Sequence, residues 1–141
     1  MYERVIVPTD GSRIAQRGVL KGLEIASELD IPAFSVYVMD LDKYKEFKDN
    51  KVNRGERRNM KKAGERALRW VRSKAHDLGV DITTDILVGE PYERIVEEAG
   101  ENDVIFMSSH GRSGFTELFL GSTTERVLKN SHCTVIVVKG D

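Results

Sequence analysis

Residues 103–111 read Asp-Val-Ile-Phe-Met-Ser-Ser-His-Gly, and this stretch indicates the class of fold. An almost wholly apolar run ends abruptly in small polar residues and a glycine. A continuous apolar run, rather than an alternating one, is typical of a strand buried on both faces in a parallel sheet that helices cover. Residues 5–7 and 135–138 form two further runs of this kind. We therefore predict an α/β protein with a doubly wound parallel sheet.

The rest of the chain alternates strand and helix patterns. Predicted strands cover residues 4–8, 33–39, 82–88, 103–107 and 133–138, and predicted helices cover 13–29, 54–78, 91–99 and 122–130. Ser12 is placed to cap the first helix, and Gly79 to end the second. This alternation predicts right-handed βαβ units in one five-stranded domain spanning residues 1–141.

Composition fits a single globular domain, with 40% hydrophobic and 32% charged residues in 141. The single cysteine, Cys133, excludes an intramolecular disulfide, which fits a reducing compartment. We find no signal-peptide pattern and no apolar stretch long enough to cross a bilayer. We therefore expect a cytoplasmic protein with no membrane association.

Positive charge is concentrated in residues 42–74, which carry 13 Lys/Arg against 5 Asp/Glu, while the remainder carries 9 against 18. This segment could be simply the solvated face of a long helix with a charged loop before it. Alternatively, it could be a flank that attracts anions near a nucleotide site, or that contacts RNA or an acidic partner. Tyr44, Phe47 and Trp70 lack the regular interleaving of a single-strand binding platform, so we do not expect nucleic acid.

The candidate site follows the first and fourth predicted strands. In an open parallel sheet, ligands bind at the carboxyl ends of the strands where the strand order reverses. The fourth strand leads into Gly111, and the chain returns at Gly121 to open a helix with Ser122, Thr123 and Thr124. The first N–H groups of a helix are unsatisfied and its dipole favours anions, so this sequence predicts a phosphate site.

Structural alternatives remain for several of these residues. The stretch 122–125 also matches a capping box, which needs no ligand. Asp10 could hold the turn or cap the first helix, or it could meet a ribose or help hold a hydrated metal. His110 could orient the loop backbone or touch a phosphate.

The sequence lacks the motifs of other nucleotide sites, of receiver domains, of metal sites and of nucleophilic catalysis. The chain has no P-loop, and no G-x-G-x-x-G follows the first strand. Asp10 stands alone where a receiver domain would have paired acids. The three histidines form no metal set, and no nucleophile elbow is present. We therefore predict no catalytic residue.

Over its whole length the chain resembles the universal stress protein family. The nucleotide signature of that family is a glycine, two residues, a glycine, nine residues, then glycine and Ser/Thr. Gly111 and Gly121-Ser122 match its second part, whereas Ser108 stands where the first glycine would be. The stretches 7–10, 88–91 and 134–139 are also similar to that family.

The resemblance implies a strand order of 3-2-1-4-5, a homodimer formed partly through Thr134–Val138, and ATP with Mg²⁺ as ligand. Matching positions imply contacts to adenosine, adenine and phosphates from Pro8, Thr9, Asp10, Val38, Met107, Ser108, Gly111, Arg112, Gly121, Ser122, Thr123 and Thr124. The Ser108 side chain narrows the space beside the backbone. A positive φ there would cost about 1–2 kcal/mol and weaken binding roughly tenfold.

We therefore expect a dimeric ATP-binding regulatory module of the stress response. No arginine finger or general base stands beside the phosphate loop, so hydrolysis would be slow at most. Two alternatives stay open: a dimeric interaction protein of the same fold with a weak or empty nucleotide site, and a true nucleotide hydrolase or transferase.

Overall fold

The structure, a computed structural model, describes residues 1–42, 53–109 and 120–139. At its centre lies a five-stranded, fully parallel sheet in the order β3-β2-β1-β4-β5. The strands are β1 (Arg4–Ile6), β2 (Ala33–Met39), β3 (Ile82–Val88), β4 (Asp103–Ser108) and β5 (Thr134–Val138). The doubly wound sheet is confirmed, and so is the strand order that the resemblance implied.

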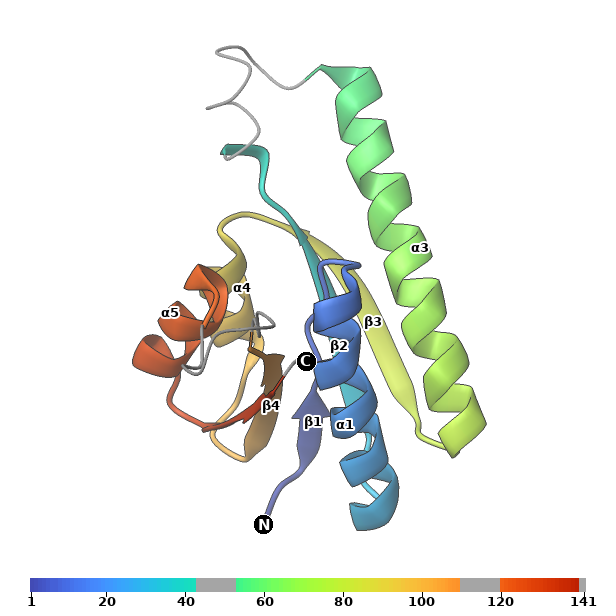
Figure 1. Cartoon of the computed structure of the whole chain (residues 1–141), viewed down its shortest axis with the longest axis vertical. Helices are drawn as coiled ribbons and strands as arrows, with labels where there is room; N and C mark the ends of the chain where they lie inside the picture. The colour runs from blue at the N-terminus through green and yellow to red at the C-terminus, as the bar shows by residue number, and fades with distance from the viewer. Residues whose placement is uncertain (43–52, 110–119, 140–141) are drawn as a thin grey trace, which may run out of the picture.

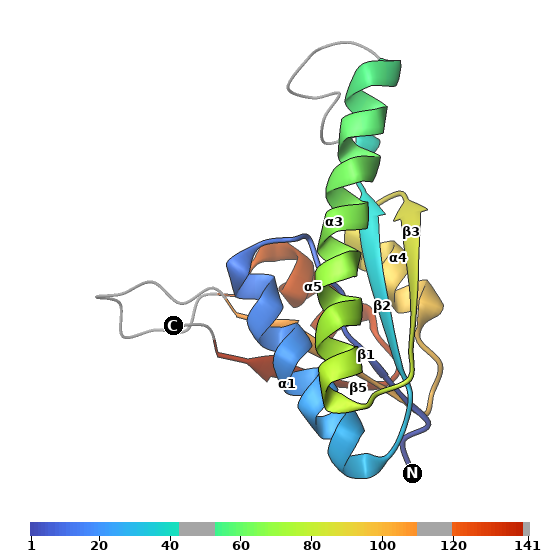
Figure 2. The ribbon, with the colours of Figure 1, turned by 90° about the vertical axis from the view of Figure 1, so that its right-hand side faces the viewer.

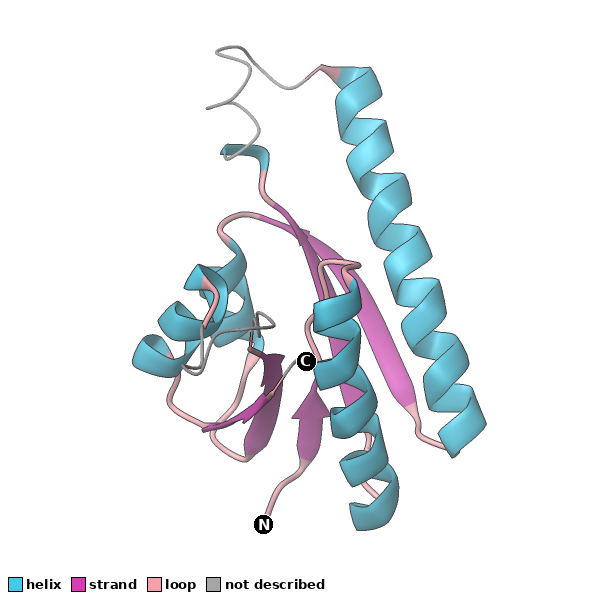
Figure 3. Ribbon diagram, in the orientation of Figure 1, coloured by secondary structure: helices cyan, strands magenta, loops and turns pink. Residues whose placement is uncertain are grey.

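Helices cover both faces of the sheet, as Figure 1 and Figure 3 show. They are α1 (Arg13–Leu29), α3 (Arg54–Leu78), α4 (Pro91–Glu98) and α5 (Ser122–Asn130). The predicted ends of the first two are confirmed. The Ser12 hydroxyl accepts the N–H of Ala15 at 3.1 Å, and Gly79 ends α3 in the left-handed conformation at φ 69°.

The core has two layers, one on each face of the sheet. Successive residues of β4 point to opposite faces, so Val104 and Phe106 pack with α1 and α3 while Ile105 and Met107 pack with α5 and α4. In the outer strand β5 the predicted burial on both faces is wrong, because β5 lies at the sheet edge and Ile136 is 39% exposed. Periodicity alone does not separate an edge strand from a central one.

Helix α3 is longer than the strands it covers and extends beyond the ends of β2 and β3 (Figure 2). A capping box starts it: the Asn53 side chain accepts the N–H of Glu56, and the Glu56 carboxylate accepts the N–H of Asn53. The first buried residue of α3 is Gly64. The preceding stretch, 54–63, contains no buried residue, and the helix runs past the ends of β2 and β3 here (Figure 2). No helix in the described part of the chain is both long and apolar enough to cross a membrane.

Candidate functional site at the carboxyl edge of the sheet

The turn between β1 and α1 is held by its own side chains. Thr9 is buried, and its hydroxyl oxygen accepts the N–H of Gly11 at 3.0 Å. The Asp10 carboxylate accepts the N–H of Ser12 at 2.9 Å, and Gly11 takes a positive φ of 84° that favours glycine. The turn-holding alternative for Asp10 is thus confirmed. Its carboxylate remains exposed, and a contact with a ribose stays a prediction.

Two apolar residues of the candidate site share one face of the sheet. Val38 near the end of β2 and Met107 near the end of β4 both belong to the core layer beneath α4 and α5. Strand β1 lies between these two strands and is shorter, ending at Ile6, although the Thr9 N–H still donates to the Val36 carbonyl at 3.0 Å. The strand order runs from β1 to β2 and β3 on one side and from β1 to β4 and β5 on the other, so it reverses at β1. The predicted adenosine contacts therefore lie where ligands bind in such sheets.

Helix α5 begins without a side-chain cap. Its N-cap is Gly121, which has no side chain, and Ser122 is already the first helical residue. The capping-box alternative for residues 122–125 is therefore wrong, because a capping hydroxyl must stand on the N-cap residue itself. Ser122 is exposed and Thr123 half-buried. The first N–H groups of α5 need a partner from outside the helix, which suits an anion.

Ser108, the last residue of β4, directs its side chain away from Met107 and towards α1. Its hydroxyl oxygen accepts the N–H of Gly18 at 2.8 Å, and its carbonyl accepts the Thr124 hydroxyl at 3.0 Å. Among the described residues outside glycine, only Asp30 has a positive φ. The backbone penalty anticipated for Ser108 is therefore not incurred. The contact spans 90 positions of sequence, and no local signal in either segment could have revealed it.

Tyr37 on β2 lies near the carboxyl edge of the sheet, and the pKa of its phenol is raised. Burial raises the pKa of its phenol, the negative charge of Asp10 raises it further, and Arg66 opposes both. The ring packs against α3 at Gly64, where an added Cβ would lie 2.7 Å from a ring carbon. Tyr37 therefore stays a neutral hydroxyl near the β1–α1 turn at ordinary pH.

Not every predicted site residue can be placed. Gly111 and Arg112, together with His110, lie outside the described residues. The remaining predicted residues occupy the carboxyl edge of the sheet, in the β1–α1 turn, the ends of β2 and β4, and the first turn of α5. Within the described ranges, no three His, Cys, Asp or Glu side chains are grouped to hold a metal ion.

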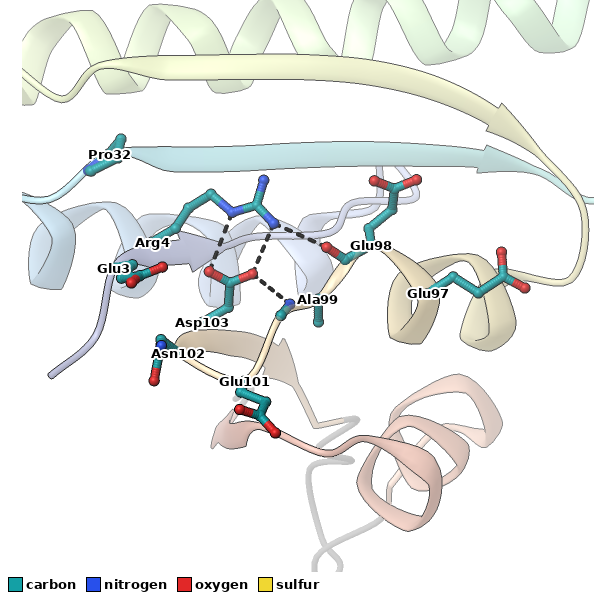
Figure 4. A pocket seen from close by; sticks show the side chains of 10 residues that line it. Glu3, Arg4, Pro32, Glu97, Glu98, Ala99, Glu101, Asn102 and Asp103 are labelled. Atoms are coloured by element: carbon teal, nitrogen blue, oxygen red, sulfur yellow. Dashed lines mark hydrogen bonds and ion pairs between the residues drawn. The ribbon is translucent and has the colours of Figure 1, made fainter.

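A hollow lies at the opposite, amino-terminal edge of the sheet (Figure 4). The Arg4 guanidinium bonds the Asp103 carboxylate at 2.8 Å and the Glu98 carbonyl at 3.0 Å, and it lies 5.1 Å from the ring centre of Phe34. Asp103 also accepts the N–H of Gly100 at 2.8 Å. These bonds join β1, α4 and β4. They explain the positions of the Arg4 and Asp103 side chains without a ligand.

Comparisons with known proteins agree with this geometry. The model of the universal stress protein family matches residues 1–139. The chain is 35% identical to universal stress protein MJ0531 of Methanocaldococcus jannaschii over 141 residues, which covers 99% of this chain and 83% of that protein. The solved structure of MJ0577, from the same organism, has a TM-score of 0.75 and 31% identity, covering 100% of this chain and 98% of that one.

A universal stress protein from Archaeoglobus fulgidus, solved in complex with dAMP, has a TM-score of 0.67. It is 20% identical, with 99% of this chain and 98% of that chain covered. At this identity the likeness shows the shared fold alone.

Proposed function

The chain belongs to the universal stress protein family, and from this premise we propose that it is a regulatory module that binds ATP with Mg²⁺. The observation that carries the proposal is the uncapped start of α5, which lies at the same sheet edge as the β1–α1 turn. The dAMP complex of the Archaeoglobus fulgidus protein supports an adenine nucleotide as the class of ligand.

In this proposal the ligand lies across the ends of β1, β2 and β4. Val38 and Met107 contact the adenine, while Pro8, Thr9 and the exposed Asp10 line the ribose. The N–H groups at the start of α5 hold the phosphates together with Gly111, and Arg112 supplies positive charge. Mg²⁺ would be held mainly by the phosphates and water, since the described residues contain no group of three His, Cys, Asp or Glu side chains that could hold it by themselves. We propose slow hydrolysis at most, in a cytoplasmic protein that serves a stress response.

Calorimetry with ATP and Mg²⁺ tests the phosphate assignment through Gly121→Val. Gly121 has φ −65° and ψ 157°, an extended conformation that valine also adopts, so the variant should fold. The added side chain would stand where the phosphates approach, and we expect ATP affinity to fall at least tenfold. Gly55→Val, near the start of α3, is the matched control and should bind like the wild type. Unchanged affinity in Gly121→Val would refute the assignment.

The nucleotide identity has its own measurement. Mass spectrometry of the small molecules released from the purified, denatured protein should find ATP or another adenine nucleotide. No ligand in that experiment, together with no heat at millimolar ATP, would favour the alternative of an interaction protein with an empty site.

We also propose a homodimer formed partly through β5. This strand lies at the sheet edge, and it presents Ile136, 39% exposed, on a surface that a second copy could cover. Analytical ultracentrifugation should find a dimer for the wild type and a monomer for Ile136→Lys. Leu29→Lys, which changes a 51% exposed leucine at the end of α1, is the control and should remain dimeric. A monomeric wild type would refute this proposal.

A further inference from the structure

Ser108 is bonded to two helices at once. Its hydroxyl accepts the Gly18 N–H at 2.8 Å and lies 3.5 Å from the Ala15 carbonyl, to which it can donate. Its own carbonyl accepts the hydroxyl of Thr124, which is 5% exposed, at 3.0 Å. One residue at the end of β4 therefore contacts both α1, which follows the Thr9–Ser12 turn, and the first turn of α5.

The fit between Ser108 and α1 depends on Gly18. A Cβ at position 18 would lie 2.7 Å from the Ser108 hydroxyl oxygen and 3.2 Å from backbone atoms of Met107 and Ser108. The hydroxyl thus occupies space that α1 leaves open only because it has a glycine there. Helix α1 accommodates the Ser108 side chain, which points away from the face of the sheet where Val38 and Met107 lie.

We infer that Ser108 is a positioning residue for the nucleotide site, an inference that rests on the proposed function. Its hydroxyl ties α1, the helix that follows the β1–α1 turn, to the end of β4, and its carbonyl ties the start of α5 to the same point. The turn and the start of α5 carry the proposed ribose and phosphate contacts. Fixing them before the ligand arrives lowers the ordering cost of binding. Ser108→Gly would complete the glycine spacing of the family signature, yet it would weaken binding here.

The expected size follows from the bond that is lost. The hydrogen bond joins α1 to β4 in the free and in the bound protein alike, so only the part that orders the site before binding enters the Kd. The loss of the hydroxyl should therefore raise the Kd for ATP by about threefold, and by about tenfold at most. Ser108→Ala keeps the Cβ and removes only the hydroxyl, so it tests the same bond if the glycine variant folds poorly. Ser27→Ala is the matched control: the Ser27 hydroxyl donates to the Leu78 carbonyl at 3.0 Å and joins α1 to the end of α3, at the other edge of the sheet.

Two readouts decide the inference. Calorimetry with ATP and Mg²⁺, well below every melting temperature, should show weaker binding for both Ser108 variants and wild-type binding for Ser27→Ala. Hydrogen–deuterium exchange without nucleotide should rise in residues 9–18 of the Ser108 variants and not in those of the control. Exchange in residues 121–127 should be unchanged, because the Ser108 carbonyl that accepts the Thr124 hydroxyl is still present in both variants. Tighter or unchanged binding by both Ser108 variants would overturn the inference. If the wild type itself binds no ATP, the proposed function fails, and unchanged exchange in residues 9–18 would still overturn the anchoring role.

Discussion

Gly22→Ala should destabilise the protein although alanine is the better helix former. Gly22 lies on the face of α1 that packs on the sheet, where an added Cβ would overlap a methyl carbon of Val7 and lie 3.1 Å from the ring of Phe106. Val7 is 0% and Phe106 2% exposed, so neither side chain can move into solvent. Something in the packing between α1 and the sheet must therefore shift.

The net effect is a difference between two opposing terms. Replacing glycine by alanine inside a helix gains about 1 kcal/mol. Overpacking a filled core costs about 1–3 kcal/mol, and a contact this short belongs at the upper end of that range. We therefore expect a net loss of about 1–2 kcal/mol, which lowers the melting temperature of a domain of this size by roughly 3–6 °C.

In urea unfolding this loss should appear as a lower urea concentration at the midpoint. The slope of the free energy of unfolding against urea concentration should be unchanged. Gly55→Ala serves as control, because its nearest neighbour would be an oxygen of Asn53 at 3.4 Å, and it should be neutral or stabilising by up to about 1 kcal/mol. The double variant with Val7→Ala should lose less than the sum of the two single losses, since the truncated side chain makes room. A Gly22→Ala protein as stable as the wild type would refute the close-packing argument.

Three further outcomes follow from the structure. Asp103→Ala should cost about 2 kcal/mol in urea unfolding, because the buried Asp103 carboxylate bonds both Arg4 and the Gly100 N–H; a loss below about 0.5 kcal/mol would contradict that role. Gly79→Ala should cost about 1 kcal/mol in thermal unfolding through its φ of 69° alone, since its Cβ would meet no atom within 4 Å, and a neutral result would mean that α3 ends differently. Burial, and then the charge of Asp103, raise the pKa of the Cys133 thiol, so it should alkylate more slowly than glutathione at about pH 8.5, and equal rates would count against this. The unfolded thiol ionises first as pH rises, so Cys133 makes the free energy of unfolding decrease above its ordinary pKa.

The elements of the fold were predictable because their signals are local. Ser12, Gly79 and the apolar spacing of α3 mark helix limits within a few residues of themselves. The strand order came from the resemblance to a family, since spacing alone fixes no order. The bounds of α5 were predicted correctly as residues 122–130, and only the capping-box alternative was wrong, because the N-cap is Gly121, one position before the stretch 122–125 that fits the pattern.

The candidate site was predictable as a set of loops but not as a set of contacts. The polar residues after β1 and β4 do share one edge of the sheet, as parallel strands require. The direction of the Ser108 side chain depends on Gly18, which lies on a helix 90 positions away, and only the assembled packing reveals that pair. The same holds for Thr124, whose hydroxyl bonds the Ser108 carbonyl.

Helix α3 has two parts of different stability, although its backbone is continuous. From Gly64 onward the helix is anchored by buried residues, whereas residues 54–63 bury none and are held at their end by the Asn53 capping box. This free portion should therefore fray and refold without the rest of the molecule opening. Arg54–Arg58 and Arg57–Lys61 place like charges four residues apart, which weakens a helix, and salt screens that repulsion. Added salt should consequently order residues 54–63 and leave the rest of this helix as it is.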